Sequence, residues 1–237
     1  IIYQNTKEAV KHVSFAVPEG KIVAIVGESG SGKSTLIRAA IGLLPAGGEL
    51  ASGQILFGEK DMAAMTAEEL RHVRGEGMAM IFQNAGDYLN PRRKVCDQYV
   101  ETLRCHQSMT KKQGYEIAKK MLATLKLPDT KHVMNAYPFQ LSGGMKQRVA
   151  IAMAMSMHPK LRLADEPTSA LDVTTQAQIV RQMMELRKNH GTSIILVTHN
   201  LGVAAYMSDR IVVMQNGRIV EEGDRKTILE QPSCAYN

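Results

Sequence analysis

The chain has 237 residues, of which 44% are hydrophobic and 22% charged, a composition typical of one large globular domain or two small ones. The net charge of +6 is scattered and aromatic residues make up only 5%, so the sequence shows no base-stacking platform and predicts no nucleic-acid partner. No apolar run approaches the ~18 residues that span a membrane, and the widely spaced Cys96, Cys105 and Cys234 form neither a metal-ligand pattern nor a disulfide framework.

The first part of the chain carries short β-type runs. The β-type runs at 13–17 and 22–26 predict two strands, and residues 18–21 between them predict a hairpin-like turn. Tyr3 lies upstream of both runs. Its ring either stacks on the base of a ligand or packs at the start of the chain, and spacing alone leaves both interpretations open.

A glycine-rich loop follows the run at 22–26 and precedes an apolar helical pattern at 36–41. Its nine residues are Gly27, Glu28, Ser29, Gly30, Ser31, Gly32, Lys33, Ser34 and Thr35. The glycines allow backbone N–H groups to turn toward phosphate oxygens, Lys33 supplies positive charge for the β- and γ-phosphates, and Ser34 offers a hydroxyl to Mg²⁺. The alternative is a plain turn that joins strand to helix. The flanking strand and helix favour a phosphate-binding loop.

The middle of the chain changes from β-type to helical patterns. Residues 78–82 predict a buried strand that ends at the polar Gln83. Residues 84–158 then carry helical patterns, notably at 111–125, where apolar side chains recur on one face. The sequence therefore predicts a helical insert within an α/β domain.

Residues 141–145, Leu-Ser-Gly-Gly-Met, open the last helix of this insert. Ser142 is suited to cap that helix, while Gly143 and Gly144 leave its amino end open to a close-approaching anion. An ordinary capped helix with a flexible start would carry the same residues. Taken alone, this pattern is weak evidence for a functional site.

Two adjacent carboxylates follow the next apolar run. Asp165 would hold Mg²⁺ directly or through water, and Glu166 would polarise an attacking water. In isolation, an acidic turn before a helix is the plainer interpretation. However, His199 follows the buried run at 194–197 in the same way, and Gln83 follows an earlier one. Three polar residues at strand ends favour a row of active-site groups.

Together these motifs resemble the nucleotide-binding subunit of an ABC transporter, over nearly the whole chain. They follow the order of that family, with Walker A at 27–34, the Q-loop at Gln83, the signature at 141–145, Walker B at Asp165 and Glu166, the D-loop at 169–172 and the switch at His199. All six in order leave little room for another family. The resemblance implies an α/β fold, a P-loop NTPase (RecA-like) core with an antiparallel β subdomain and a helical subdomain. One ATP-binding domain would span residues 1–237, with the helical subdomain at about 84–158.

Finer details resemble the branch of this family that imports peptides and nickel. They are Leu-Asn-Pro at 89–91, Met145 in place of the more usual Gln, and the run A-D-E-P-T-S-A-L-D-V-T from Ala164. The terminal residues 231–236 also resemble that branch, although Cys-Ala at 234–235 departs from its usual tail. A peptide is the first expectation for the solute, and nickel or a metal chelate is the alternative.

Two further positions depart from the family pattern. Arg162 lies within the Walker B strand, where relatives are apolar. Because a central parallel strand is buried on both faces, we expect Arg162 to lie at the strand's mouth or beside a carboxylate. Asn200 follows His199 where Asp is common. Neither departure removes a catalytic group.

The resemblance also implies a mechanism and its partners. Two subunits, either identical or paralogous, would dimerise head to tail, and ATP with Mg²⁺ on one P-loop would be capped by Ser142 and Gly144 of the other. Tyr3 would stack on adenine, Gln83 would reach Mg²⁺ and the water, and His199 would contact the γ-phosphate. The helical insert would receive a helix of the transmembrane permease at the cytoplasmic face of the membrane. A substrate-binding protein would be an indirect partner.

The same motifs also occur in two other classes of ABC protein. A soluble ABC protein acting on ribosomes or DNA would usually carry two ABC domains, or a long coiled coil before the signature. This chain has one set of motifs and a compact insert without sustained heptads. A non-hydrolysing regulatory partner is disfavoured because Glu166 and His199 are both present.

Overall fold

A computed structural model describes residues 1–4, 7–169 and 171–231, and within them a six-stranded sheet organises the chain. The strands lie in the order β11 (Arg218–Asp224), β10 (Arg210–Gln215), β3 (Ile22–Val26), β9 (Ser193–Val197), β8 (Leu161–Asp165) and β7 (Met78–Ile81). Neighbours from β10 to β7 are parallel, and β11 pairs antiparallel with β10. The central strands are mostly apolar because a parallel sheet is covered on both faces, and β8 also carries the buried Arg162 and Asp165. The predicted α/β fold is confirmed.

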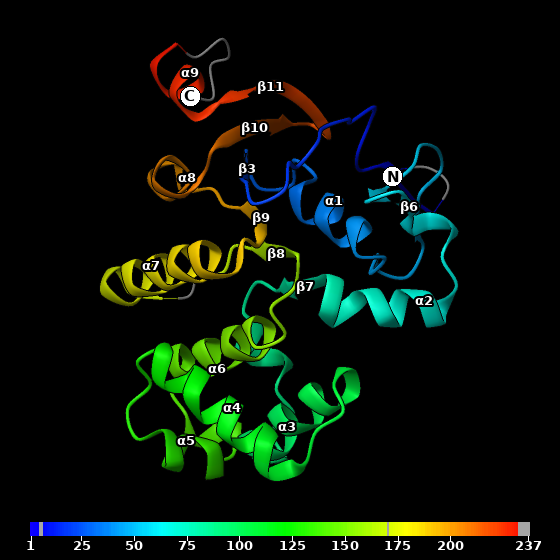
Figure 1. Cartoon of the computed structure of the whole chain (residues 1–237). Coiled ribbons are helices and arrows are strands. Elements are labelled where there is room, and N and C mark those ends of the chain that lie inside the picture. Colours follow the sequence, from blue (N-terminus) through cyan, green and yellow to red (C-terminus); the bar gives the residue numbers. More distant parts are fainter. Residues whose placement is uncertain (5–6, 170, 232–237) are drawn as a thin grey trace.

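Alternate side chains of the central strands face opposite sides of the sheet and enter different core clusters. On β9, Ile194 and Leu196 pack in one core, while Ile195 packs in the other. The helices that cover the two faces are α6 (Gly143–Met155) and α7 (Val173–His190) on the first, and α1 (Lys33–Ala40) on the second. Figure 1 shows α1 and α7 on opposite sides of the strands. This layering places the turn into α1 at the carboxyl end of β3.

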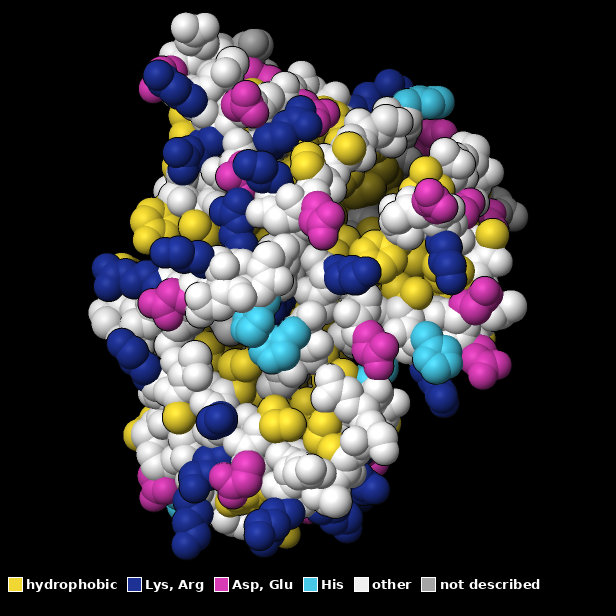
Figure 2. Space-filling view, in the orientation of Figure 1, with side chains coloured by type: hydrophobic (Ala, Val, Ile, Leu, Met, Phe, Trp, Pro, Cys, Tyr) yellow, Lys and Arg dark blue, Asp and Glu magenta, His cyan; other side chains and the backbone are white. Residues whose placement is uncertain are grey.

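The segment between β7 and β8 is helical, as the sequence predicted. It contains the helices α3 (Val95–His106), α4 (Lys111–Thr124), α5 (Thr130–Asn135) and α6, with short 3₁₀ turns at Ala85–Tyr88 and Pro138–Gln140. Figure 1 shows these helices together as the green lower part of the molecule. The apolar face predicted for α4 is buried at Met121, Leu122 and Leu125. On the face shown in Figure 2, Lys and Arg are interspersed with Asp and Glu over both the sheet and helical parts.

Smaller elements complete the described chain. The short strands β1 (Ile2–Tyr3), β2 (Lys7–Glu8) and β4 (Gly48–Glu49) form an antiparallel sheet, and β5 (Leu56–Phe57) pairs with β6 (Lys60–Asp61). The short helices are α2 (Ala67–His72), α8 (Leu201–Met207) and α9 (Arg225–Glu230). The chain kinks after α2, where Arg74 and Gly75 have non-helical backbone angles. These antiparallel strands agree with the predicted antiparallel β part of the fold.

The predicted hairpin at the start of the chain is wrong. Residues 13–17 form no strand, and β3 instead pairs in parallel with β9 and β10. The alternating pattern arises because Val13, Phe15 and Val17 pack half-buried against the core on the α1 side, while the residues between them are exposed. Packing on one face thus produced a period of two without a hydrogen-bonded partner strand.

The described residues provide no carboxylate partner for Arg162. Arg162 is the second residue of β8 and is only 1% exposed. Its Nε, Nη1 and Nη2 make no hydrogen bond within the described part of the chain, and no ion pair joins it to a carboxylate there. Burial lowers the pKa of this guanidinium to about 10. The expected carboxylate partner is therefore wrong for the described residues, and the position of Arg162 near the start of β8 leaves its side chain buried.

Some sequence predictions fall on residues that the structure does not describe. These are residues 232–236 of the predicted tail, which include Cys234, and Ala170 of the D-loop. Cys96 and Cys105 lie within the described chain as free thiols. Among the described helices, none is both long and apolar enough to cross a membrane.

Candidate active site

The loop between β3 and α1 forms the centre of the site. Gly27, Gly30 and Gly32 adopt φ angles of 149°, 81° and 98°, in the region that favours glycine. A Cβ at Gly27 would collide with the carbonyl oxygen of Met214 on β10. Gly32 occupies the amino cap of α1 and has no side chain with which to cap it. The first N–H groups of α1 are thus left available to an anion, where the helix dipole favours negative charge.

The side chain of Lys33 lies on the inside of this loop. Its Nζ donates to the carbonyl oxygens of Gly27 at 2.8 Å and Glu28 at 2.6 Å, and lies 3.3 Å from Oγ of Ser31. Burial lowers the pKa of Lys33, and two nearby carboxylates oppose that shift. By contrast, Glu28 and Ser29 are exposed. The loop therefore holds one ammonium group where phosphate oxygens would enter.

Ser34 connects the loop to the end of β8. Its Oγ donates to Oδ1 of Asp165 at 2.7 Å, and Thr35 follows on α1. Asp165 is fully buried, and burial raises the pKa of its carboxyl group, while the hydrogen bond from Ser34 opposes that shift. Its second oxygen, Oδ2, makes no hydrogen bond within the described chain. A buried, unpartnered carboxylate oxygen beside a hydroxyl fits a hard divalent cation such as Mg²⁺.

No cluster of three or more His, Cys, Asp or Glu side chains suited to a metal occurs in the described part of the chain. This is compatible with Mg²⁺, which takes one or two carboxylates and completes its shell with phosphate oxygens and water. The donors present at Ser34 and Asp165 agree with that chemistry.

Three polar side chains from the ends of β7, β8 and β9 meet at Glu166. Gln83 donates from Nε2 to Oε2 of Glu166 at 3.4 Å, and Nδ1 of His199 lies 3.2 Å from Oε1. The Glu166 side chain is 18% exposed and that of His199 is 62% exposed, so the carboxylate is sheltered and the imidazole faces solvent. The structure therefore brings together the three residues that the sequence placed at separate strand ends.

The backbone of Glu166 is held in an unusual conformation. Its φ is 44°, in the left-handed region that a non-glycine residue seldom adopts. The Glu166 N–H donates to the carbonyl of Val197 at 2.9 Å, and the Glu166 carbonyl accepts from the N–H and Oγ of Ser169. These bonds stabilise a conformation that costs on the order of 1–3 kcal/mol and that often occurs at functional sites.

Asn200, which follows His199, has a local structural role. Its side chain accepts a hydrogen bond from the Val203 N–H at 3.2 Å and so caps α8. Asn and Asp are about equally good in this position. The departure from the family pattern at Asn200 thus preserves the cap that follows the switch histidine.

The signature segment lies apart from the phosphate-binding loop of its own chain. Ser142 caps α6 by accepting from the Met145 N–H at 3.3 Å, and it is exposed, as is Gly143. Gly144 is half-buried near Leu171 of the D-loop. Within the described residues no hydrogen bond joins 142–144 to 27–35, and Figure 1 shows α6 in the helical part, away from α1.

Tyr3 also lies outside the cluster formed by these contacts. It belongs to β1, is half-buried, and has its ring against Gly48 of β4. The same N-terminal segment reaches the loop further along, where Ala9 and Val10 pack against Gly32. The structure therefore places Tyr3 on a segment that adjoins the loop.

Sequence reasoning missed Gln147, which contacts two parts of the site. This side chain on α6 is 2% exposed, accepts from the Gly86 N–H and donates to the Pro167 carbonyl. The available signal was a polar residue within a helix whose neighbours Val149 and Ile151 are apolar. That signal alone does not identify the two backbone groups that Gln147 contacts.

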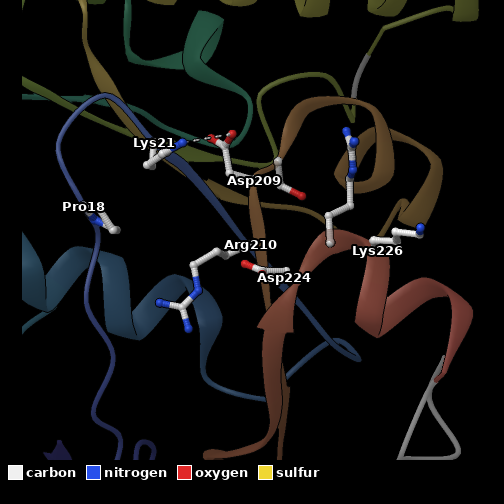
Figure 3. A pocket seen from close by; sticks show the side chains of 8 residues that line it. Pro18, Lys21, Asp209, Arg210, Asp224 and Lys226 are labelled. Carbon is white, nitrogen blue, oxygen red and sulfur yellow. Dashed lines mark ion pairs between the residues drawn. The ribbon is translucent and has the colours of Figure 1, made fainter.

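A separate hollow of about 360 Å³ lies at the other end of the parallel strands, where β3 and β10 begin. It is lined by Pro18, Lys21, Ser208, Asp209, Arg210, Asp224, Arg225 and Lys226, which lie where β3 and β10 begin and β11 ends. Figure 3 shows Lys21 and Asp209 pointing toward one another. Because the predicted site residues follow the carboxyl ends of the strands, this hollow is distinct from the nucleotide site.

Asp209 in this hollow stabilises the start of the sheet. Its Oδ2 accepts from the Ile22 N–H and from Nη2 of Arg187, both at 2.7 Å, and so connects β3, α7 and β10. We expect Asp209→Asn to lower the free energy of unfolding by about 1.5–3 kcal/mol, the usual contribution of hydrogen bonds to a charged group. Urea denaturation would measure this. Asp224→Asn makes the same chemical change at an exposed position and should stay within about 0.5 kcal/mol of wild type. Equal losses in both variants would contradict the assignment.

The fold and the contacts at Lys33, Asp165 and Glu166 define a class of protein. A parallel sheet, a phosphate-binding loop after β3 and carboxylates at the end of a neighbouring strand are the arrangement of a P-loop nucleoside triphosphatase.

Comparison with known proteins gives the family. The ABC transporter family matches residues 10–169. The dipeptide transport ATP-binding protein DppD of Bacillus subtilis is 44% identical over 99% of this chain and 70% of its own length. The oligopeptide transport ATP-binding protein OppD of Haemophilus influenzae is 43% identical over 97% of this chain and 71% of its own length. The chain belongs to the ABC transporter family and is an ATPase.

A solved structure supports the same conclusion. The dimeric post-hydrolysis structure of the ATP-binding cassette MJ0796, bound to ADP and Pi, superposes with a TM-score of 0.82 at 29% identity. The match covers 92% of this chain and 90% of that one. The expected family and fold are therefore confirmed, and nucleotide binding follows from them.

Proposed function

We propose that this chain powers the import of peptides by hydrolysing ATP at the cytoplasmic face of a membrane. The convergence of Gln83 and His199 on Glu166, next to the Ser34–Asp165 pair, carries the catalytic part of this proposal. The names of DppD and OppD favour a peptide over nickel or a metal chelate as the solute. In this assignment residues 1–237 are a single ATP-binding domain, with a helical subdomain at about 84–158.

The loop and its neighbours bind the nucleotide. Backbone N–H groups of 27–35 and the Lys33 ammonium bind the β- and γ-phosphates. Ser34, Asp165 and Gln83 would hold Mg²⁺, which neutralises charge on those phosphates when bound. Tyr3 stacks on adenine, and its support is that β1 leads into the residues packed against Gly32.

Glu166 is the residue that activates water. As the water oxygen attacks the γ-phosphorus, its proton passes to the Glu166 carboxylate and the bond to the β–γ bridging oxygen breaks. Gln83 and His199 contact the two oxygens of that carboxylate and hold it in one orientation. His199, being exposed, is also available to the γ-phosphate.

A second subunit completes each site. The exposed Ser142 and Gly143, with Gly144, cap the γ-phosphate bound to the partner, and the open amino end of α6 stabilises negative charge there. Two solved structures of the cassette MJ0796 are described as dimeric, which supports this arrangement for two identical or paralogous subunits. The helical part contacts transmembrane permease subunits, and a substrate-binding protein delivers the solute to them.

The solute is tested with the assembled transporter in proteoliposomes. The ATP hydrolysis rate is measured with the binding protein empty, loaded with di- or oligopeptides, or supplied with Ni²⁺. We expect peptides to stimulate hydrolysis and to accumulate inside, with a Lys33→Ala assembly as the inactive control. Stimulation by Ni²⁺ or a metal chelate, with none by peptides, would contradict peptide import and favour the alternative solute.

A further inference from the structure

Gln147 makes two hydrogen bonds that join three segments of the active region. It lies on α6, five residues beyond the Ser142 cap, with its side chain almost fully buried. Its Oε1 accepts from the Gly86 N–H at 3.2 Å, and its Nε2 donates to the Pro167 carbonyl at 2.9 Å. Both ends of one side-chain amide are therefore satisfied by backbone groups from outside its own helix.

The two backbone groups belong to the segments that carry the water-activating residues. Gly86 lies three residues beyond Gln83, in the short turn Ala85–Tyr88. Pro167 directly follows Glu166. The side chains of Gln83 and Glu166 are themselves in contact at 3.4 Å. Gln147 therefore joins the two backbone segments whose side chains meet in the site.

The turn at Ala85–Tyr88 packs closely against α6 next to Gln147. At Gly86, a Cβ would lie 2.7 Å from the Cβ of Lys146, so the turn lies directly against α6. A buried amide is costly unless both its donor and its acceptor are bonded, and an apolar side chain would fill the same space without that cost. Gln147 is thus better explained by the two segments that it holds than by packing alone.

We propose that Gln147 is a positioning residue for ATP hydrolysis, through which α6 sets the relative placement of Gln83 and Glu166. The proposal rests on the catalytic roles assigned above. Because Ser142 begins the same helix, a shift of α6 on capping the partner's nucleotide would move both segments together. Capping of the partner's nucleotide by Ser142 would then change the relative positions of Gln83 and Glu166 in the chain that carries this Ser142, through the hydrogen bonds of Gln147.

The test compares two buried glutamines that donate hydrogen bonds to backbone carbonyls in different parts of the molecule. Gln182 on α7 is 5% exposed and donates to the Thr124 carbonyl at 2.6 Å, within the helical side of the molecule. Gln147→Leu is expected to lower kcat about 10- to 100-fold, since a misplacement of 1 Å costs about that much, and to leave KM for ATP nearly unchanged. Gln182→Leu should lower the melting temperature but leave kcat near wild type. Gln147→Met, a flexible side chain of similar length, serves if Gln147→Leu does not fold.

A second measurement asks whether Gln147 acts through Glu166. In a Glu166→Gln background, the further loss caused by Gln147→Leu should be much smaller than in wild type, because the group being positioned is already gone. Equal loss in both backgrounds, or equal kcat in Gln147→Leu and Gln182→Leu, would overturn the proposal. Failure of the underlying catalytic assignment is distinguishable, because wild type and Glu166→Gln would then hydrolyse ATP at the same rate.

Discussion

Replacing Glu166 by Gln is expected to abolish most ATP turnover while leaving ATP binding intact. Gln preserves the size of the side chain and can still contact Gln83 and His199, but it cannot accept a proton from water. General-base catalysis contributes roughly 10²- to 10⁴-fold, and the loss in kcat should lie in that range. Steady-state hydrolysis and equilibrium binding of a fluorescent ATP analogue would measure the two effects separately.

Two other variants make this result specific to Glu166. Glu185→Gln makes the same chemical change at an exposed position on α7 and should hydrolyse ATP at the wild-type rate. Lys33→Ala removes the ammonium inside the loop and should weaken ATP binding as well. A Glu166→Gln rate within about threefold of wild type would remove Glu166 from the role of general base.

Gln83, Glu166 and His199 could be named from the sequence because each follows an apolar run, whereas the roles expected for Tyr3 and Ser142 came from the family resemblance. In a parallel sheet the carboxyl ends of neighbouring strands share one edge, so Gln83, Glu166 and His199 were expected to lie near one another. The particular contacts could not be predicted. Ser34 and Asp165 are 131 residues apart, and their 2.7 Å hydrogen bond depends on the pairing order β3-β9-β8, which local patterns do not encode.

Other features of the site are invisible to sequence patterns for a different physical reason. The left-handed backbone of Glu166 is imposed by hydrogen bonds to Val197 and Ser169, whereas intrinsic preference would place a glycine there. Gln147 belongs to a helix correctly predicted to begin at Ser142, but its role depends on two backbone groups contributed by other segments. Tertiary contacts decide both cases.

The errors in the fold have related causes. Residues 13–17 alternate between half-buried and exposed side chains, which is the signature of a strand, yet the pattern reports only which side chains face the core. Arg162 was expected to find a carboxylate because burial of an unpaired charge is unfavourable. That rule states the free-energy cost of burying an unpaired charge, and it does not ensure that a carboxylate lies nearby. In the structure the guanidinium is buried, and burial lowers its pKa to about 10.

Ser142→Arg is expected to lower ATP hydrolysis by at least about 10²-fold while leaving the ATP affinity of a single subunit nearly unchanged. Ser142 is exposed and no hydrogen bond joins it to residues 27–35 in the described chain, so a large side chain there would disturb the partner's site rather than its own. Thr110→Arg is the matched control. Thr110 caps α4 with the same bond to the third residue of its helix, so its loss should cost about 1 kcal/mol of stability without affecting turnover.

Mixing two inactive variants tests the shared site directly. Ser142→Arg keeps an intact phosphate-binding loop, and Lys33→Ala keeps an intact signature helix. In a mixed dimer, one site combines the intact loop of the first chain with the intact Ser142 of the second, and the other site carries both lesions. If one complete site suffices, partial ATPase activity should reappear on mixing, in proportion to the fraction of mixed dimers. Full activity of Ser142→Arg alone would rule out its role across the dimer. Failure of every mixing ratio to recover activity would instead mean that both composite sites must be intact for turnover, since each variant retains the half that the other lacks.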